Sequence, residues 1–240
     1  MNRALPVACL ADIKSSAIKP NAVAALCALA AALSCQPATA QTAGQWLVAL
    51  GINEISPQVK SGDLSPPSLP GTRIDVRSAR APILTVVKML TDNWSVEGFA
   101  GLAYKHEIVG AGAIQGVGRL GSVKAISPTV LLQYRFLAPT DGFRPYLGIG
   151  PSYAHFFDER GSATLTALSQ PGSVATRMKI DDALGLSMQV GANFKLNERW
   201  FLDASVIKTL LKTTTTLSTG QKLDAKLDPV STNFSVGYRF

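Results

Sequence analysis

The feature that most constrains this chain is a strict alternation of apolar with small or polar residues, repeated in segment after segment beyond residue 40. Period-two alternation predicts β-strands, because successive side chains of a strand point to opposite faces. One clear example is the run 184–194, LGLSMQVGANF. Eight such segments are predicted, at about 45–59, 73–89, 94–108, 124–136, 144–157, 179–195, 199–212 and 226–240.

The two faces of these strands differ in a way that points to a membrane. The chain is 47% hydrophobic and 16% charged, and neither face is heavily charged. A barrel in water would carry charge outside, whereas a membrane barrel turns its apolar face to lipid and its small or polar face inward. Long connections at about 60–72, 109–123, 158–178 and 213–225 alternate with short turns. The fold class predicted is all-β: an eight-stranded antiparallel transmembrane up-and-down barrel, with its long loops outside and both ends of the barrel chain on the periplasmic side.

The first 40 residues have the order of a secretory signal. Arg3, Lys14 and Lys19 precede the apolar run 22–33, and the small residues Ala38 and Ala40 follow it. We therefore predict a cleaved signal peptide over 1–40, a barrel domain over 41–240 that begins at about Gln41, and the outer membrane of a Gram-negative bacterium as the location. The three cysteines all lie in the predicted leader, so the mature chain has no thiol for a disulfide or a metal.

Charge and composition argue against several other classes of function. The formal charge is +7, of which the leader carries +2, and the remaining +5 is spread along the chain without a basic run. Nucleic-acid binding is therefore not expected. With two histidines and no mature cysteine, neither a metal nor another cofactor is expected. His155 and Ser152 have opposite parity in one predicted strand, so they do not make a catalytic pair, and we predict no enzyme.

Six aromatic residues are predicted to form a girdle at one rim of the barrel. The three tryptophans begin strands at the periplasmic end, and three phenylalanines finish strands there. Aromatic side chains at one height on the lipid-facing side are typical of a membrane interface, although aromatic residues also favour strands in general. The predicted girdle is Trp46, Trp94, Phe136, Phe194, Trp200 and Phe240.

The inward parity predicts two sets of residues inside the barrel. A charge plug near the periplasmic rim would contain Glu97, Arg135, Lys195, Asp203 and Arg239, because charges in a narrow lumen have to pair. The plug either holds the barrel's shape or blocks the periplasmic exit. An apolar lining above it would contain Phe99, Leu131, Phe201 and Ile207, which serve either as core packing or as a ligand pocket.

Five blocks of sequence resemble the OmpW family of small outer-membrane proteins. They are TDNWSVE (91–97), SPTVLLQYRF (127–136), RPYLGIGPSYAHFFDE (144–159), LNERWFLDASV (196–206) and LDPVSTNFSVGYRF (227–240). The resemblance covers essentially the whole predicted mature chain. It implies an eight-stranded barrel with a narrow, largely apolar interior that lets small hydrophobic molecules cross the outer leaflet, and it brings no catalytic residue. The loops depart from the family pattern.

Three functions follow as hypotheses from different classes. The first is a narrow channel for small hydrophobic molecules, the second a structural or adhesive barrel whose loops bind partners, and the third a lipid-modifying barrel hydrolase. The expected partners are outer-membrane lipid, small hydrophobic solutes and the barrel-assembly machinery. The C-terminal aromatic strand, which ends in Phe240, resembles the signal by which that machinery recognises outer-membrane barrels. The sequence leaves the oligomeric state open.

Overall fold

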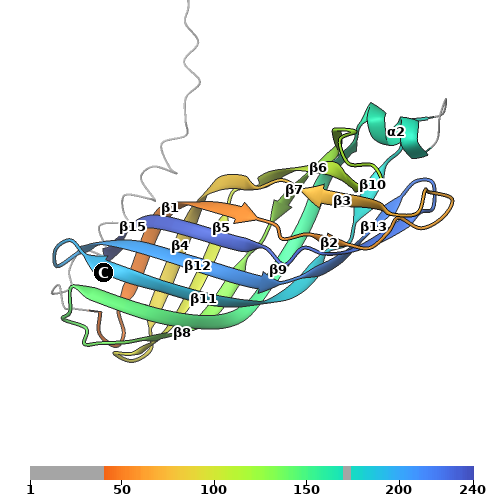
Figure 1. Cartoon of the computed structure of the whole chain (residues 1–240). Helices are drawn as coiled ribbons and strands as arrows, with labels where there is room; N and C mark the ends of the chain where they lie inside the picture. Colours follow the sequence, from red (N-terminus) through yellow and green to blue (C-terminus); the bar gives the residue numbers. More distant parts are fainter. Residues whose placement is uncertain (1–40, 170–173) are drawn as a thin grey trace, which may run out of the picture. The chain divides into compact units, whose positions relative to one another are not determined.

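The computed structural model of the chain describes residues 41–169 and 174–240. The predicted signal peptide and its three cysteines lie outside these described residues. Eight antiparallel strands close into a barrel (Figure 1). In spatial order they are β11 (Ala183–Lys195), β12 (Trp200–Leu210), β15 (Val230–Arg239), β1 (Trp46–Ser56), β4 (Ala79–Met89), β5 (Trp94–Gly101), β8 (Thr129–Arg135) and β9 (Phe143–Gly161), which pairs with β11 again.

The predicted fold class is confirmed, and the ends of the chain close the barrel. β1 pairs with β15 from Leu47↔Arg239 to Ser56↔Val230. The Phe240 backbone N–H adds a hydrogen bond of 2.9 Å to the Trp46 carbonyl. The alternation read from the sequence appears directly as burial, because β8 alternates strictly between buried and exposed residues along its whole length.

Several of the predicted long strands are broken in the structure. The segment predicted at 94–108 is β5 followed by β6 (Tyr104–Gly112), and the segment predicted at 124–136 is β7 (Arg119–Ile126) followed by β8. Each break lets the chain change partners, since β5 pairs with β8 whereas β6 pairs with β7 and β3 (Thr72–Val76). The strand predicted at 73–89 is likewise β3 followed by β4.

The predicted long loops also contain regular structure, which forms an extension of the barrel wall. A four-stranded sheet consists of β10 (Met178–Ile180), β13 (Lys212–Leu217), β14 (Lys222–Lys226) and β2 (Lys60–Ser61). The upper part of β9 pairs with β7, which continues through β6 to β3. The short helix α2 (Ala163–Ser169) packs next to β7. β2, β13 and β14 lie almost entirely in connections that were predicted as loops, because their apolar positions are interrupted by Thr, Gly and Lys. β3, β6, β7 and β10 overlap predicted strands.

One glycine shows how tightly the interior of the barrel is packed. A Cβ atom at Gly237 on β15 would lie 2.1 Å from the Phe201 ring. The absent side chain therefore provides the space that this ring occupies. Phe201 packs in turn with Leu47, Ala49, Val87 and Met89, which are all buried inside the barrel. They lie near the end where β1 begins and β15 finishes, which is called the lower end below.

Candidate functional site

The outer surface of the barrel strands carries exposed, large hydrophobic side chains. Leu50 and Ile52 on β1 and Phe234 on β15 are each more than 60% exposed. Such a surface is expected where a barrel faces lipid. Five of the six residues predicted to form a girdle are between 40% and 47% exposed, and Phe240 is partly buried.

Neighbouring aromatic rings extend the girdle set. Tyr134 lies between Trp94 and Phe136, with ring centroids 5.1 and 5.0 Å away. Tyr238 similarly contacts Trp200 and Phe240 at 5.2 and 4.8 Å. Phe143 contacts Phe194 at 5.2 Å. The predicted girdle did not include Tyr134, Phe143 and Tyr238, although Tyr134 and Tyr238 share the lipid-facing parity of their strands.

The interior of the lower barrel holds a polar network centred on Arg135 of β8. The guanidinium is 1% exposed and donates to Ser95 Oγ at 3.0 Å, to Gln133 Oε1 at 2.8 Å and to Asn193 Oδ1. It also lies 4.8 Å from the centre of the Tyr146 ring. A buried charge is tolerated when its donors are satisfied in this way.

Both buried carboxylates of the predicted plug are bound by neutral side chains. Glu97 accepts hydrogen bonds of 2.9 Å from Gln133 and from Gln189. Asp203 accepts from the Tyr146 hydroxyl at 2.8 Å and from Asn193. No direct ion pair within 4 Å joins either carboxylate to a base in the described parts of the chain; Gln133 and Asn193 bridge them to Arg135 instead.

The remaining predicted plug residues are placed apart from this network. Lys195 lies at the end of β11, and its Nζ is 2.7 Å from Glu198 Oε1 in the following turn. Arg239 is 7% exposed and lies 5.2 Å from the centre of the Phe201 ring. A buried arginine that the prediction omitted, Arg144 of β9, donates to Gln41 Oε1 at 3.0 Å and to the Asp92 carbonyl at 2.6 Å. Its inward parity was the available signal.

Above the network, four hydroxyl groups form a chain across neighbouring strands. Thr129, Ser152, Ser187 and Thr209 are each at most 8% exposed, and their oxygens are 2.6, 2.5 and 2.7 Å apart in that order. Ser152 therefore points into the barrel. His155 lies on the other face of β9, where its Nδ1 is 2.7 Å from Asp182 Oδ2. Ser152 and His155 therefore do not contact each other.

Asp182 joins β9 to the segment between β10 and β11 through hydrogen bonds, at the place where β9 and β11 separate. It follows β10 and accepts a 3.0 Å hydrogen bond from the Phe156 backbone N–H and one of 2.8 Å from the Tyr153 hydroxyl. His155, the Phe156 N–H and the Tyr153 hydroxyl together hold the pKa of Asp182 at about 2. One step higher, the Ile180 backbone N–H lies 3.4 Å from Glu159 Oε1. Side chains thus replace the backbone ladder between β9 and β10.

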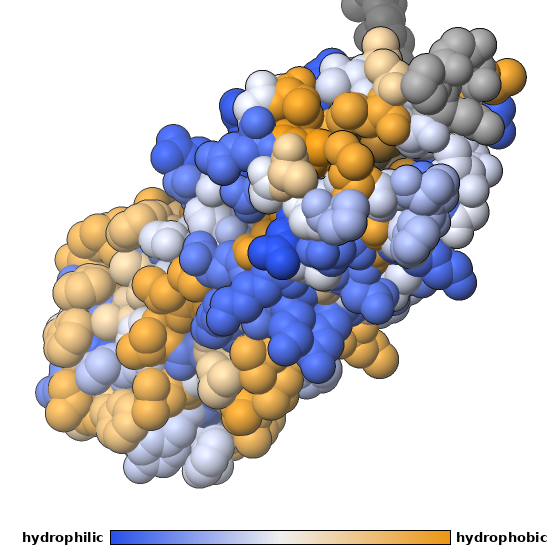
Figure 2. All heavy atoms as spheres, turned by 45° about the vertical axis from the view of Figure 1, so that its right-hand side comes forward, coloured by the Kyte–Doolittle hydropathy of each residue, from blue (hydrophilic) through white to orange (hydrophobic). Residues whose placement is uncertain are grey.

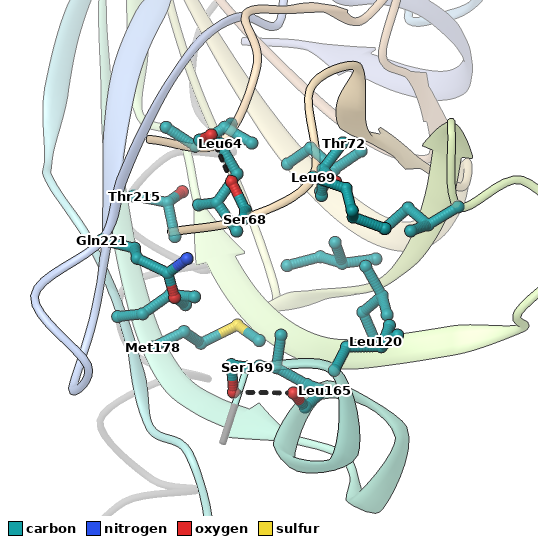
Figure 3. A pocket seen from close by; sticks show the side chains of 16 residues that line it. Leu64, Ser68, Leu69, Thr72, Leu120, Leu165, Ser169, Met178, Thr215 and Gln221 are labelled. Carbon is teal, nitrogen blue, oxygen red and sulfur yellow. Dashed lines mark hydrogen bonds between the residues drawn. The ribbon is translucent and has the colours of Figure 1, made fainter. Parts of the chain in front are cut away.

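The extension above the hydroxyl chain encloses an apolar interior. A cavity of about 90 Å³ lies between α2 and the segment around Leu69 (Figure 3). Among the side chains that point into it are Leu64, Leu120, Leu165 and Met178, and few of its lining atoms are polar. A second cavity of about 70 Å³ lies against Phe156, Ala125, Val123 and Leu227. Ile74, Ile108 and Thr215 line both cavities, so the two lie next to each other.

The predicted apolar lining belongs to a different place from these cavities. Leu131, Phe201 and Ile207 are at most 2% exposed inside the lower barrel, and Phe99 is partly buried. None of these four residues lines either apolar cavity. The cavities were not predicted, because most of the first cavity's wall and part of the second's come from connections that were predicted as loops.

One titratable side chain lies in the wall of the second cavity. His106 of β6 is 6% exposed, and its Nδ1 lies 2.9 Å from the Arg77 carbonyl, to which it donates. Burial lowers the pKa of His106, because the charged imidazolium would lose its hydration there. Among the described residues no group of three or more His, Cys, Asp or Glu side chains could hold a metal ion.

Several known proteins are similar to this chain in sequence or in fold. The chain is 34% identical over 223 residues to outer membrane protein W of Vibrio cholerae serotype O1, which covers 90% of this chain and 98% of that protein. It is 27% identical over 175 residues to the dibenzothiophene metabolism operon protein PahQ of Pseudomonas aeruginosa, covering 72% of this chain and 77% of that one. The crystal structure of the outer membrane protein OprG from Pseudomonas aeruginosa superposes with a TM-score of 0.75 at 29% identity, covering 84% of this chain and 98% of that one. A model of the OmpW family matches residues 42–240, and the chain therefore belongs to the OmpW family of outer-membrane barrels.

Proposed function

We propose that this barrel takes up small hydrophobic molecules from outside the cell into the two apolar cavities of the extension and releases them sideways into the membrane. The observation that carries the proposal is the change of interior character along the barrel: the extension is lined by Ile, Leu, Val, Phe and Met, whereas the barrel below it contains a buried polar network and a hydroxyl chain beside the apolar cluster around Phe201. An apolar solute is stabilised in the first environment and gains nothing in the second.

The polar interior would then act as the closed end of the path. The hydroxyl chain from Thr129 to Thr209 and the network around Arg135 fill an eight-stranded lumen, which has room for little besides side chains. Displacing these groups would leave buried donors and acceptors without partners. We assign Glu97, Arg135 and Asp203 to this plug, together with Arg144, and we assign no part in it to Lys195.

A sideways exit is most easily opened where the wall has the fewest backbone hydrogen bonds. β9 and β11 pair up to Ala154↔Ala183, and beyond this pair the wall is joined through the side chains of Asp182 and Glu159. Phe156 and Ile180 line the second cavity at this seam. The PahQ relative is named for an operon of dibenzothiophene metabolism, and an apolar aromatic compound of this kind is the class of solute that we expect here.

Uptake into asymmetric proteoliposomes, with lipopolysaccharide in the outer leaflet as the barrier, tests the proposal. Dibenzothiophene should enter faster than in protein-free vesicles, whereas arabinose should not. Thr215→Phe puts a ring between the two cavities and should abolish the gain, because Thr215 lines both. The matched control, Thr216→Phe, is on the outer face of the same strand and should keep it.

Uptake of dibenzothiophene at the protein-free rate by the folded wild-type barrel would overturn the proposal and leave a structural or loop-binding barrel. Equal uptake by the Thr215→Phe and wild-type proteins would show that the solute does not pass through these cavities.

A further inference from the structure

The outward face of the four-stranded sheet carries three lysines side by side. Lys212 of β13 is directly opposite Lys226 of β14, and Lys226 is directly opposite Lys60 of β2. All three side chains are exposed. The residues next to them in sequence, Thr213 and Ala225, point inward and line the second cavity. The row is therefore fixed in place by the alternation of these strands.

No ion pair compensates the charge of this row among the described residues. Like charges directly opposite each other destabilise a sheet. Among the described residues no carboxylate oxygen lies within 4 Å of the Nζ atom of any of the three lysines. The nearest acid along the strand is Asp224, whose Oδ1 accepts a 2.7 Å hydrogen bond from Thr214. An open groove of about 460 Å³ lies along the row and is lined by all three lysines and by Asp224, so three bases face one acid there.

A second pair of facing lysines in the extension is arranged differently. Lys105 of β6 is opposite Lys124 of β7. The Nζ atom of Lys124 is 3.0 Å from Asp158 Oδ2, and the Arg160 side chain contacts the same carboxylate. The fold thus gives Lys124 an acid of its own, shared with Arg160, whereas none of Lys60, Lys212 and Lys226 has one within 4 Å.

The height of the row indicates which anion would meet it. Leu210 is 46% exposed, and Lys212 lies two residues further along the chain, about 7 Å at 3.3 Å per residue. The row therefore lies just outside the hydrophobic surface, on the side of the long connections. Figure 2 shows a hydrophilic surface between the hydrophobic barrel surface and a second hydrophobic patch near the other end. In a membrane that covers the hydrophobic barrel surface, this height would be that of the head groups of the outer leaflet.

We propose that the row of Lys60, Lys212 and Lys226 binds the phosphate groups of the anionic glycolipid in the outer leaflet. An ammonium group serves a phosphate as a point charge with three donors, and neighbouring lysines can share one phosphorylated sugar. Each basic side chain near an anionic membrane surface strengthens binding by about fivefold, which follows from about 1 kcal/mol per residue. Bound phosphate would also remove the repulsion between the facing lysines.

Native mass spectrometry of the folded full-length barrel in neutral detergent tests the proposal, with diphosphoryl lipid A as the probe. Lys212→Gln with Lys226→Gln should weaken binding by roughly 10- to 25-fold, from two such contributions. The matched control, Lys105→Gln with Lys124→Gln, removes the same number of charges from the other facing pair, where Asp158 already binds Lys124, and should change binding less than twofold. Heat modifiability on gels checks that each variant is folded.

Three further arms give the proposal a definite outcome. Lys212→Arg with Lys226→Arg should keep the binding, and dephosphorylated lipid A should lose it. Inorganic phosphate at the same concentration should not compete, because it lacks the acyl chains that hold the lipid at this height. Equal losses in the two double variants, equal binding of dephosphorylated lipid A, or full competition by inorganic phosphate would each overturn the assignment.

Discussion

The two halves of this barrel enclose opposite interiors within one continuous wall. β8 turns Gln133 and Arg135 inward in the lower barrel, whereas β7, which precedes it in the chain, turns Leu120 and Val123 inward in the extension. The outer surfaces are reversed as well, since β8 exposes Leu132 and the extension exposes lysines. The half in lipid gains little from burying apolar groups inside, because its surroundings are already apolar. The half in water forms an ordinary hydrophobic core.

The comparison predicts that the lower half depends on hydrogen bonds, and Arg135→Met should have the largest effect. The change leaves Ser95, Gln133 and Asn193 without their shared donor. We expect the free energy of unfolding to fall by about 3–5 kcal/mol, as for other broken buried charge networks. Urea unfolding in detergent micelles, followed by tryptophan fluorescence, measures it.

An exposed arginine serves as the control for Arg135. The Nε atom of Arg160 lies 2.7 Å from Asp158 Oδ1 on the surface of the extension. Arg160→Met should cost less than about 1 kcal/mol, because water solvates the separated charges. Equal losses in the two variants would contradict the view that the buried network carries stability.

The upper half should respond to the opposite substitution. Ile108 is 4% exposed and lies between the two cavities, so Ile108→Asn would bury an amide among apolar side chains. We expect a local loss of about 2–4 kcal/mol from lost apolar burial and the unpaired amide. Amide hydrogen exchange should become faster in β6 and β7 and stay unchanged in β1 and β4. A uniform increase in all eight barrel strands would show that the two halves are not independent.

A smaller effect is expected at the hydroxyl chain, where the two interiors meet. Ser187 Oγ lies 2.5 Å from Ser152 Oγ and 2.7 Å from Thr209 Oγ1. Ser187→Ala should therefore lower the free energy of unfolding by about 1 kcal/mol. Ser205 is a matched control, because its buried hydroxyl has no protein partner among the described residues. Ser205→Ala should change stability by less than about 0.5 kcal/mol, and the reverse order of the two losses would refute this distinction.

Alternation alone predicted the strands and the facing of their side chains, because both depend only on neighbouring residues. The parity of β8 and β12 puts Leu131, Arg135, Phe201 and Asp203 inside, where they are buried. The partners of these residues could not be predicted, since they depend on the register between distant strands. Gln133 reaches Gln189 across β9, and Lys195 at a strand end pairs with Glu198 instead of the interior. β2, β13 and β14 of the extension were predicted as loops, because short Thr-rich strands such as β13 become stable only when their inner faces pack together.

The least effect is expected from the one buried imidazole of the extension, and its sign follows from the apolar surroundings. Burial lowers the pKa of His106 below its ordinary value of 6.5. As the pH falls through 6.5 the unfolded chain takes up a proton that the folded extension still excludes, so the stability present above this pH is lost on acidification. His106→Asn keeps an N–H donor for the Arg77 carbonyl but does not titrate. Hydrogen exchange of β6 should therefore accelerate between pH 7.5 and 5.5 more in the wild type than in His106→Asn, once both are corrected for the intrinsic exchange rate. Parallel pH profiles would mean that the extension admits enough water around His106 to hydrate its charge, and that the two interiors differ less than their side chains indicate.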